Sequence, residues 1–370
     1  MNTESFMTHR VYNFSAGPAT LPLPVLEQVQ QELLDFNGLG ASVIEISHRS
    51  KPFLNLMEEA EALFRELTGL PQTHRMLYMH GGAQMQFSCV PLNLIGLHPK
   101  RQAAYAITGK WGELAEKEAR KYGRTEIVLD GKDSGYHAIP AWSPEQWDPE
   151  TSYLHLTTNN TLYGTQWFEF PETRGVPLVG DATSEMLSRE LDWDRFGLLY
   201  AGLQKNLGPS GVCLVLLHED LLGHALPETP KLLDYDAFAT QNSLPNTINT
   251  FAVYVFKLVL EWVRDQGGLA EMERRSRERA RIVYEVLDSS SGFYLPVAET
   301  PYRSLMNVTF HFHQEDLLHR FVQQADQEGL YALAGHREVG GARASMYNAM
   351  PVEGAHALAE FMREFERTQG

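Results

Sequence analysis

The sequence predicts an α/β protein, with a large domain whose mostly parallel seven-stranded sheet is covered by helices, and a smaller α+β domain at the C-terminus. Three observations support this fold class. The chain of 370 residues is longer than a single hydrophobic core usually organises. Apolar runs alternate with segments of helical period, which is typical of crossover units in a parallel sheet. Near residue 250 the pattern changes to long helices with isolated strands.

Seven apolar, β-rich runs supply the strands of the expected sheet. They are MLYMH (76–80), AAYAIT (103–108), EIVL (126–129), SYLHLTT (152–158), VPLVGD (176–181), GLLYAG (197–202) and VCLVLLH (212–218). The clearest helix between them is FLNLMEEAEALFREL (53–67), because its apolar residues form one stripe and its acids lie opposite. We therefore expect a sheet with helices packed on both faces.

The C-terminal part of the chain follows a different order of elements. Helical patterns cover 250–266, 268–290, 315–329 and 353–367, and strand-like runs cover MNVTFHF (306–312) and RASMYN (343–348). We assign residues 16–265 to the large domain and 266–370, together with the N-terminal segment 1–15, to the small domain. No internal repeat or low-complexity linker separates them, so the two domains are expected to pack closely.

Charge and cysteine usage narrow the class of function. The net charge is −16, from 47 acidic and 31 basic residues. Nucleic acids and anionic membranes need a basic surface, so neither is an expected partner. The two cysteines, Cys89 and Cys213, fit a reducing compartment better than a disulfide framework. The sequence has no signal-peptide pattern and no apolar run near the ~18 residues of a membrane span, so we expect a soluble, cytoplasmic protein.

Two charged residues stand at the ends of apolar runs. Lys205 in YAGLQKNLGPSG lies between two strand-like segments, where a surface-loop lysine is the ordinary interpretation. Asp181 ends the run VPLVGD, where a helix N-cap is the ordinary alternative. The carboxyl ends of parallel strands are also where α/β sheets bind ligands.

Three further features follow other expected strands. HGGAQMQF (80–87) places a Gly-Gly turn before a helical segment, which can present backbone N–H groups to an anion, although an ordinary tight turn explains it as well. It matches neither of the two nucleotide-binding glycine motifs. Trp111 is either a core residue or a flat face for a ring, and Thr161 is either a turn residue or a hydroxyl ligand.

Taken together, these residues supply what pyridoxal phosphate requires. That cofactor needs an amine for covalent attachment, a carboxylate against its pyridine nitrogen and an aromatic face. It also needs a hydroxyl near its phenolate oxygen and N–H donors for its phosphate. The sequence offers one candidate for each, after successive strands.

Motifs along the whole chain carry a resemblance to a known family. The stretches NFSAGP, SVIEISHRS, HGGAQMQF, GDATSEMLSR, YAGLQKNLGPSG, LPNTINTF, GHREVGGARASMYNAMP and FMREFER resemble the phosphoserine aminotransferases, which belong to the class V, fold-type I pyridoxal-phosphate aminotransferases. The resemblance runs from about residue 11 to the C-terminus. It implies a ping-pong transfer of an amino group between O-phospho-L-serine and 2-oxoglutarate, in serine biosynthesis and also with 4-phosphohydroxythreonine in pyridoxal synthesis.

The resemblance also implies roles for individual residues. Lys205 would hold the cofactor, Asp181 would pair with the pyridine nitrogen, and Trp111 would stack on the ring. Thr161 would bond the phenolate oxygen. The cofactor phosphate would be held by the backbone at Ala83 and Gln84, by the Gln204 side chain and, from a neighbouring subunit, by Asn246 and Thr247. This last contribution implies a homodimer with composite active sites.

Substrate choice is expected to depend on a set of cationic side chains. By resemblance, Arg343 would bind the α-carboxylate, and the distal phosphate or carboxylate would be bound by His48, Arg49, His336 and Arg337. Guanidinium groups bind both anions bidentately. The ordinary alternative for each is a surface charge, and Arg337 beside Glu338 is explained as well by an ion pair. Some relatives carry GGGR where this chain has GGAQ at 81–84, so one phosphate-binding arginine is absent.

Two other functions compete with this one. One is a class V aminotransferase of glyoxylate, alanine or unphosphorylated serine, which would not need the second cationic cluster. The other is a non-catalytic relative, against which the filled lysine, aspartate, tryptophan and arginine positions argue. His311 and His313 lie two apart on an expected strand, but we assign no metal site to them because no third ligand is near.

Overall fold

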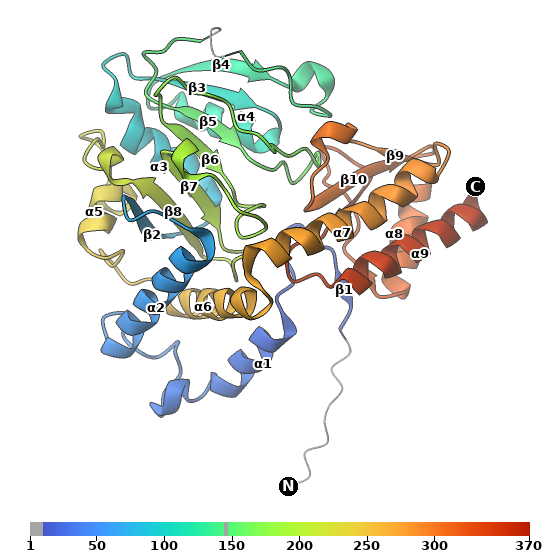
Figure 1. Cartoon of the computed structure of the whole chain (residues 1–370), viewed down its shortest axis with the longest axis horizontal. Coiled ribbons are helices and arrows are strands. Elements are labelled where there is room, and N and C mark those ends of the chain that lie inside the picture. The colour runs from blue at the N-terminus through green and yellow to red at the C-terminus, as the bar shows by residue number, and fades with distance from the viewer. Residues whose placement is uncertain (1–9, 144–146) are drawn as a thin grey trace.

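Seven strands form one sheet in the order β2-β8-β7-β6-β5-β3-β4 in the computed structural model, which describes residues 10–143 and 147–370 (Figure 1). The strands are β2 (His74–His80), β3 (Gln102–Ile107), β4 (Arg124–Asp130), β5 (Leu154–Thr157), β6 (Leu178–Asp181), β7 (Leu198–Gly202) and β8 (Val212–His218). Only β8 runs against its neighbours, and the other paired strands are parallel. The expected seven-stranded, mostly parallel sheet is confirmed.

The sheet is buried on both faces, which explains why its strands are apolar at consecutive positions. Leu214 and Leu216 of β8 belong to the same apolar cluster as α2 (Lys51–Thr68) and α6 (Thr250–Asp265). Cys213 and Val215 belong to a second cluster on the other face, with α3 (Ala83–Leu94), α4 (Lys110–Ala119) and α5 (Tyr235–Thr240). Alternate residues of a strand therefore meet different helices, as strand geometry requires.

Helix α2 shows how the sequence sets one of these elements. Pro52 occupies the first turn, where the missing N–H costs nothing. Phe53, Leu56 and Phe64 are among the side chains on its buried stripe. Gly69 ends the helix in the left-handed conformation at φ 69°, and its N–H donates to the carbonyl of Arg65.

The C-terminal part of the chain builds a third apolar cluster around a three-stranded antiparallel sheet of order β12-β10-β9. Its elements are α7 (Gly268–Ser289), β9 (Tyr294–Pro296), β10 (Asn307–Phe312), α8 (Leu317–Gln327), β11 (Leu330–Tyr331), β12 (Ala342–Ser345) and α9 (Val352–Gln369), which group together in Figure 1. The N-terminal strand β1 (Tyr12–Asn13) pairs with β11, and Phe14 is fully buried in this cluster. Strand β12 ends at Ser345, so it is shorter than the strand that the sequence predicts over 343–348.

The proposed division of the chain at residue 265 stays a prediction. Helix α7 contributes to two of the three apolar clusters, because Leu269 and Met272 belong to the first and Ala280 belongs to the C-terminal one. Residues 1–9 of the segment assigned to the small domain lie outside the described residues.

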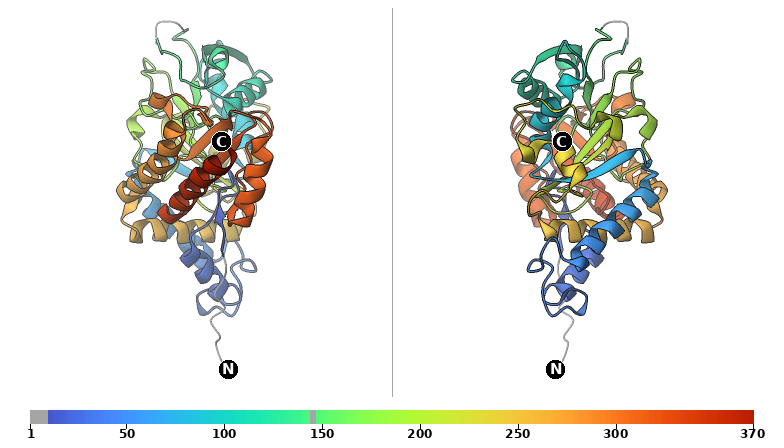
Figure 2. Two further views of the ribbon diagram at one scale, coloured as in Figure 1. Left: turned by 90° about the vertical axis from the view of Figure 1, so that its right-hand side faces the viewer. Right: turned by 90° about the vertical axis from the view of Figure 1, so that its left-hand side faces the viewer.

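The segment around α1 (Leu23–Glu32) projects from the body of the molecule in both side views (Figure 2). Several large apolar side chains on and near it are exposed, namely Leu33, Leu34, Leu39 and Ile44. Leu34 is 84% exposed, which is unusual for a leucine beside a helix. Within the described part of the chain, no helix is long and apolar enough to cross a membrane.

Candidate active site

A cavity of about 540 Å³ opens at the carboxyl ends of the parallel strands. The residues that line it are Ala16, Gly17, Pro18, Gly82, Ala83, Gln84, Phe87, Trp111, Thr157, Asn159, Thr161, Leu162, Asp181, Thr183, Ser184, Gln204, Lys205, Ser210, Gly211, His336 and Arg343. Segments far apart in the sequence meet here because parallel strands end at one edge of a sheet.

Lys205 lies in this cavity and not on the surface. Strand β7 ends at Gly202, and the following turn is closed by a bond of 2.7 Å from the N–H of Gly208 to the carbonyl of Leu203. The Lys205 side chain is 9% exposed, and its Nζ donates to Thr161 Oγ1 at 2.6 Å. Burial lowers the pKa of Lys205 to about 8, although the charge of Asp181 opposes that shift. About half of the amine is therefore in its neutral, nucleophilic form near pH 8.

Asp181 ends β6 with its carboxyl group in the same cavity. The segment that follows it is a turn, so the helix N-cap interpretation is wrong, although the side chain does accept a bond of 3.0 Å from the Thr183 N–H. Burial raises the pKa of Asp181, and the bonds from Thr183 and the charge of Lys205 act against that shift. A cationic partner in the cavity would stabilise this carboxylate.

Trp111 stands in the first turn of α4, which follows β3. Its Nε1 is buried and has no hydrogen-bond partner among the described residues. Gly109 precedes the helix, and a side chain there would collide with the Oδ1 atom of Asn160. The close approach of these two loops brings the indole and Thr161 to the same cavity.

The N-terminus of α3 forms another part of the cavity wall. Gly81 adopts φ 84°, a conformation that glycine tolerates best, and the helix then begins at Ala83. The first N–H groups of a helix have no partner within it, and the helix dipole adds positive potential there. Because Gln84, Gln204 and Ser210 also line the cavity, this end can bind an anionic group.

Arg343 brings a cation to the same cavity from the C-terminal sheet. It lies on β12 opposite Thr309 of β10, and its N–H donates to the carbonyl of Leu333 at 2.8 Å. Its Nε is buried and has no hydrogen-bond partner among the described residues. Since a buried guanidinium group normally has a partner, this one is suited to bind a carboxylate.

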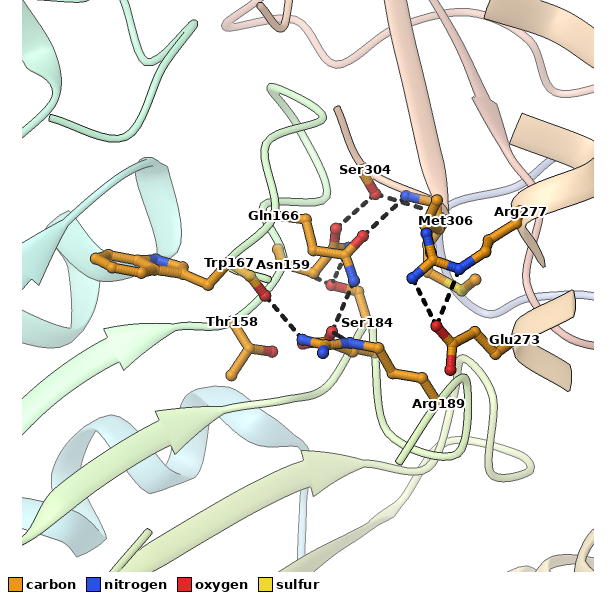
Figure 3. Close-up of polar contacts among 12 residues, drawn as sticks. Thr158, Asn159, Gln166, Trp167, Ser184, Arg189, Glu273, Arg277, Ser304 and Met306 are labelled. Atoms are coloured by element: carbon orange, nitrogen blue, oxygen red, sulfur yellow. Dashed lines mark hydrogen bonds and ion pairs between the residues drawn. The ribbon is translucent and has the colours of Figure 1, made fainter. Parts of the chain in front are cut away.

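A buried polar network holds the loop that carries Thr161 (Figure 3). The Asn159 amide donates to Ser184 Oγ and Asn307 Oδ1, each at 2.8 Å, and its Oδ1 accepts from Ser304. These bonds join the large sheet to the strand β10 that pairs with Arg343's strand. The network therefore fixes the Thr161 loop relative to the C-terminal sheet.

A second branch of the network contains a buried ion pair. Glu185 is fully buried, and its Oε1 accepts bonds of 2.6 Å from both Gln166 Nε2 and Arg189 Nε (Figure 3). The Gln166 Oε1 accepts in turn from the Leu305 N–H at 2.8 Å. The sequence did not point to these side chains as part of the site. For Asn159 and Ser184, the one signal for such a role was their position just beyond the end of a strand.

The structure brings most of the expected site residues together in the cavity. These are Ala83, Gln84, Trp111, Thr161, Asp181, Gln204, Lys205, His336 and Arg343. The other expected residues do not line it, namely His48, Arg49, Asn246, Thr247 and Arg337. Arg49, Thr247 and Arg337 are exposed. The Oδ1 atom of Asn246 lies 3.0 Å from Nε2 of His80, which does not line the cavity either.

The donor set of the cavity fits pyridoxal phosphate. A buried amine of lowered pKa lies close to a hydroxyl, a buried carboxyl group can pair with a pyridinium nitrogen, and an indole has a free edge. The helix N-terminus adds a site for the phosphate. No single one of these features is specific for pyridoxal phosphate, but their combination in one cavity is.

Comparison with known proteins agrees with this chemistry. Residues 11–358 match the family model of the class-V aminotransferases. A phosphoserine aminotransferase of Geobacillus kaustophilus is 49% identical over 358 residues, which cover 97% of this chain and 99% of that protein. The solved phosphoserine aminotransferase of Bacillus circulans subsp. alkalophilus has a TM-score of 0.94 at 42% identity, and the match covers 98% of this chain and 100% of that one.

A structure with cofactor bound is also similar. The phosphoserine aminotransferase of Trichomonas vaginalis, solved with pyridoxal phosphate, has a TM-score of 0.90 at 34% identity, over 96% of this chain and 100% of that one. The fold, the cavity and the family model thus agree.

Proposed function

The chain belongs to the class-V aminotransferase family and is a pyridoxal-phosphate-dependent aminotransferase, and from this premise we propose that it transfers an amino group between O-phospho-L-serine and 2-oxoglutarate. The products of this transfer are 3-phosphohydroxypyruvate and L-glutamate, and the reversible reaction runs as two half-reactions in serine biosynthesis. The observation that carries the proposal is that Arg343, whose buried Nε has no hydrogen-bond partner among the described residues, lines the cavity of Lys205 together with His336. The names of the relatives support the phosphorylated substrate.

When bound, pyridoxal phosphate supplies an aldehyde and a ring that accepts electrons from the substrate's α-carbon. Lys205 would attach the cofactor through its amine. Once released, that amine would take the proton from the α-carbon of the amino donor in one half-reaction and supply a proton to the α-carbon of the new amino acid in the other. Asp181 would hold the proton on the pyridine nitrogen and so keep the positive charge of the ring. The raised pKa of the empty carboxyl group means that this pairing also relieves the cost of burying Asp181.

Other residues orient the cofactor. The Trp111 indole would cover the ring face, and the Thr161 hydroxyl, which accepts from Lys205 in this structure, would bond the phenolate oxygen. The backbone of Ala83 and Gln84 and the side chain of Gln204 would hold the cofactor phosphate. Each of these residues lines the cavity.

Arg343 binds the α-carboxylate of the substrate, as its free buried Nε suggests. His336 lines the cavity and, with Arg337 next to it in the chain, binds the distal phosphate of phosphoserine or the distal carboxylate of glutamate. The N–H of Glu338 donates to His336 Nδ1 at 3.3 Å, so Nε2 carries the proton of the neutral ring. That nitrogen can then donate to the anion.

The protein acts as a homodimer with composite sites. Asn246, Thr247, His48 and Arg49 do not line the cavity of their own chain, so they serve the site of the partner. The exposed apolar residues near α1 would supply part of the surface for this association, because several of them lie within one short segment. The cytoplasm is the proposed location, and phosphohydroxythreonine, an intermediate of pyridoxal synthesis, is a second proposed substrate.

The visible spectrum of the holoenzyme tests the substrate assignment. O-phosphoserine and L-glutamate, added separately, should each bleach the absorption of the bound cofactor, whereas L-serine and L-alanine should not. The variants Arg49→Met and Arg337→Met should lose most of the response to O-phosphoserine. Bleaching by alanine or serine as readily as by phosphoserine would assign the protein to aminotransferases of uncharged substrates, and a protein that never binds the cofactor would be a non-catalytic relative.

A further inference from the structure

An ion pair joins the helix that begins beside the cofactor site to the turn that carries the distal anion ligands. Lys110 Nζ lies 3.0 Å from Glu338 Oε2, and the two side chains are 28% and 36% exposed. Lys110 opens α4 and directly precedes Trp111. Glu338 follows His336 and Arg337, and an ion pair with the adjacent Arg337 was the ordinary alternative that the sequence left open. The structure pairs it with Lys110 instead.

The turn that contains Glu338 is held at its base by its own backbone. The N–H groups of Val339 and Gly340 both donate to the carbonyl of His336, at 2.9 and 2.7 Å. Gly335 donates to the carbonyl of Gly341 at 2.8 Å, which closes the loop. These bonds fix the shape of the turn, but they do not fix its distance from α4.

Lys110 supplies a connection between α4 and this turn. Its ammonium group also lies 3.4 Å from Glu113 Oε2, and Glu113 Oε1 accepts from Tyr136 OH at 2.6 Å. The lysine is thus anchored on the large-sheet side while it binds Glu338 on the side of the C-terminal sheet. The bond from Glu338 N–H to His336 Nδ1 carries this constraint to a residue that lines the cavity.

We propose that Lys110 and Glu338 are positioning residues that hold His336 and Arg337 at the mouth of the cavity, in place for the distal anionic group of the substrate. This inference rests on the proposed function, since it assigns a means of binding the phosphate end of that substrate. Exposed ion pairs contribute little to folding stability, so the pair acts mainly on substrate affinity.

The test measures KM and kcat for O-phosphoserine with holoenzyme carrying Lys110→Met, Glu338→Gln or both changes. Each single change should raise KM roughly 2- to 5-fold, the range that corresponds to an exposed ion pair, and leave kcat unchanged. The double variant should be no worse than either single one, because both remove the same interaction. Lys110→Arg should keep the KM of the unaltered enzyme.

Lys100→Met is the matched control. Lys100 also bridges two carboxylates, Asp148 at 2.7 Å and Glu150 at 2.6 Å, but it precedes β3, whereas Lys110 follows that strand at its carboxyl end. Its KM should equal that of the unaltered enzyme. A fall in KM for Glu338→Gln would overturn the inference, because Glu338 would then only repel the substrate. Equal KM values for Lys110→Met and Lys100→Met would overturn it as well.

The same assay separates this inference from the proposed function. If the unaltered enzyme does not use O-phosphoserine, the proposed function fails and the inference fails with it. If the unaltered enzyme uses it normally and the variants show no change in KM, only the inference fails.

Discussion

The Lys205 amine donates a hydrogen bond of 2.6 Å to the Thr161 hydroxyl, which joins the turn after β7 to the loop after β5. Both groups are buried, so this bond replaces the water that a lysine would otherwise keep around its charge. The two residues are 44 positions apart in the sequence. It holds the Lys205 amine and the Thr161 hydroxyl together in the same cavity.

Replacing Lys205 with alanine should abolish turnover. In the proposed mechanism the Lys205 amine attaches the cofactor and moves the α-proton, so its loss is expected to lower the rate by roughly 1,000-fold or more. Borohydride reduction followed by mass spectrometry should find cofactor attached to the unaltered chain and none attached to the variant. Full activity in the variant would contradict the assignment of Lys205.

Attachment of cofactor to the cofactor-free protein should become faster as the pH rises through about 8. Only the neutral amine attacks the aldehyde, and burial lowers the pKa of Lys205 from 10.5 to about 8. The rate should rise about tenfold per pH unit below this value and level off above it. Stopped-flow absorbance of added pyridoxal phosphate measures this, and a midpoint near 10.5 would show that the amine is not desolvated.

The same lowered pKa affects the stability of the cofactor-free protein. Between about pH 8 and pH 10.5 the unfolded chain holds a proton on Lys205 that the folded chain has released, so the free energy of unfolding should increase with pH in that window. Denaturant titrations at several pH values should show this increase. The variant Lys205→Ala should lack it, which makes that variant the control.

Replacing Asp181 with asparagine should separate activity from stability. The amide cannot hold the proton on the pyridine nitrogen, so we expect kcat to fall roughly 100-fold, on the scale of one lost electrostatic contact in an active site. In the cofactor-free protein, burial raises the pKa of Asp181, so its charge is unfavourable above that pKa and asparagine should stabilise the fold or leave it unchanged. Melting temperatures and kcat measured together test both halves; a marked loss of stability would contradict the second.

Two ion pairs, each between residues four positions apart, should differ in how much they contribute to the free energy of unfolding. Glu185 pairs with Arg189 where the side chains are 0% and 11% exposed, whereas Glu285 pairs with Arg281 where they are 54% and 60% exposed. Glu185→Gln leaves a mostly buried guanidinium group without its charge partner, and should lower the free energy of unfolding by about 3 kcal/mol. Glu285→Gln should change it by less than about 1 kcal/mol. Equal losses in urea titrations would contradict this contrast.

Local patterns were enough to predict the strands and the long helices. The stripe in α2 and the apolar runs of β7 and β8 reflect burial that each segment shows in its own sequence. Helix α4 was not predicted, because Gly112 and its many charged residues weaken the apolar stripe. The order of strands was not predicted either: β8 enters antiparallel between β2 and β7, and that choice depends on pairing between segments distant in the chain.

The features of the site also fall into those that the sequence could indicate and those that it could not. Lys205 and Asp181 could be selected because each stands at the end of an apolar run, and the structure brings both to the cavity. The pairing of Glu338 with Lys110 could not be predicted, because an adjacent arginine was the obvious partner in the sequence. The contacts of Asn159 with Ser304 and Asn307 were also missed, since an asparagine in a turn shows nothing of the distant strand it will meet.

The pairing of β1 with β11 has a consequence for the order in which the protein can be completed during synthesis. Tyr12 and Asn13 pair with Leu330 and Tyr331, and Phe14 is buried among side chains from the last part of the chain. The first strand to leave the ribosome therefore has no partner until the ribosome has translated nearly the whole message. Arg343 follows β11, so a chain released early would expose Phe14 and would lack the guanidinium group of its active site.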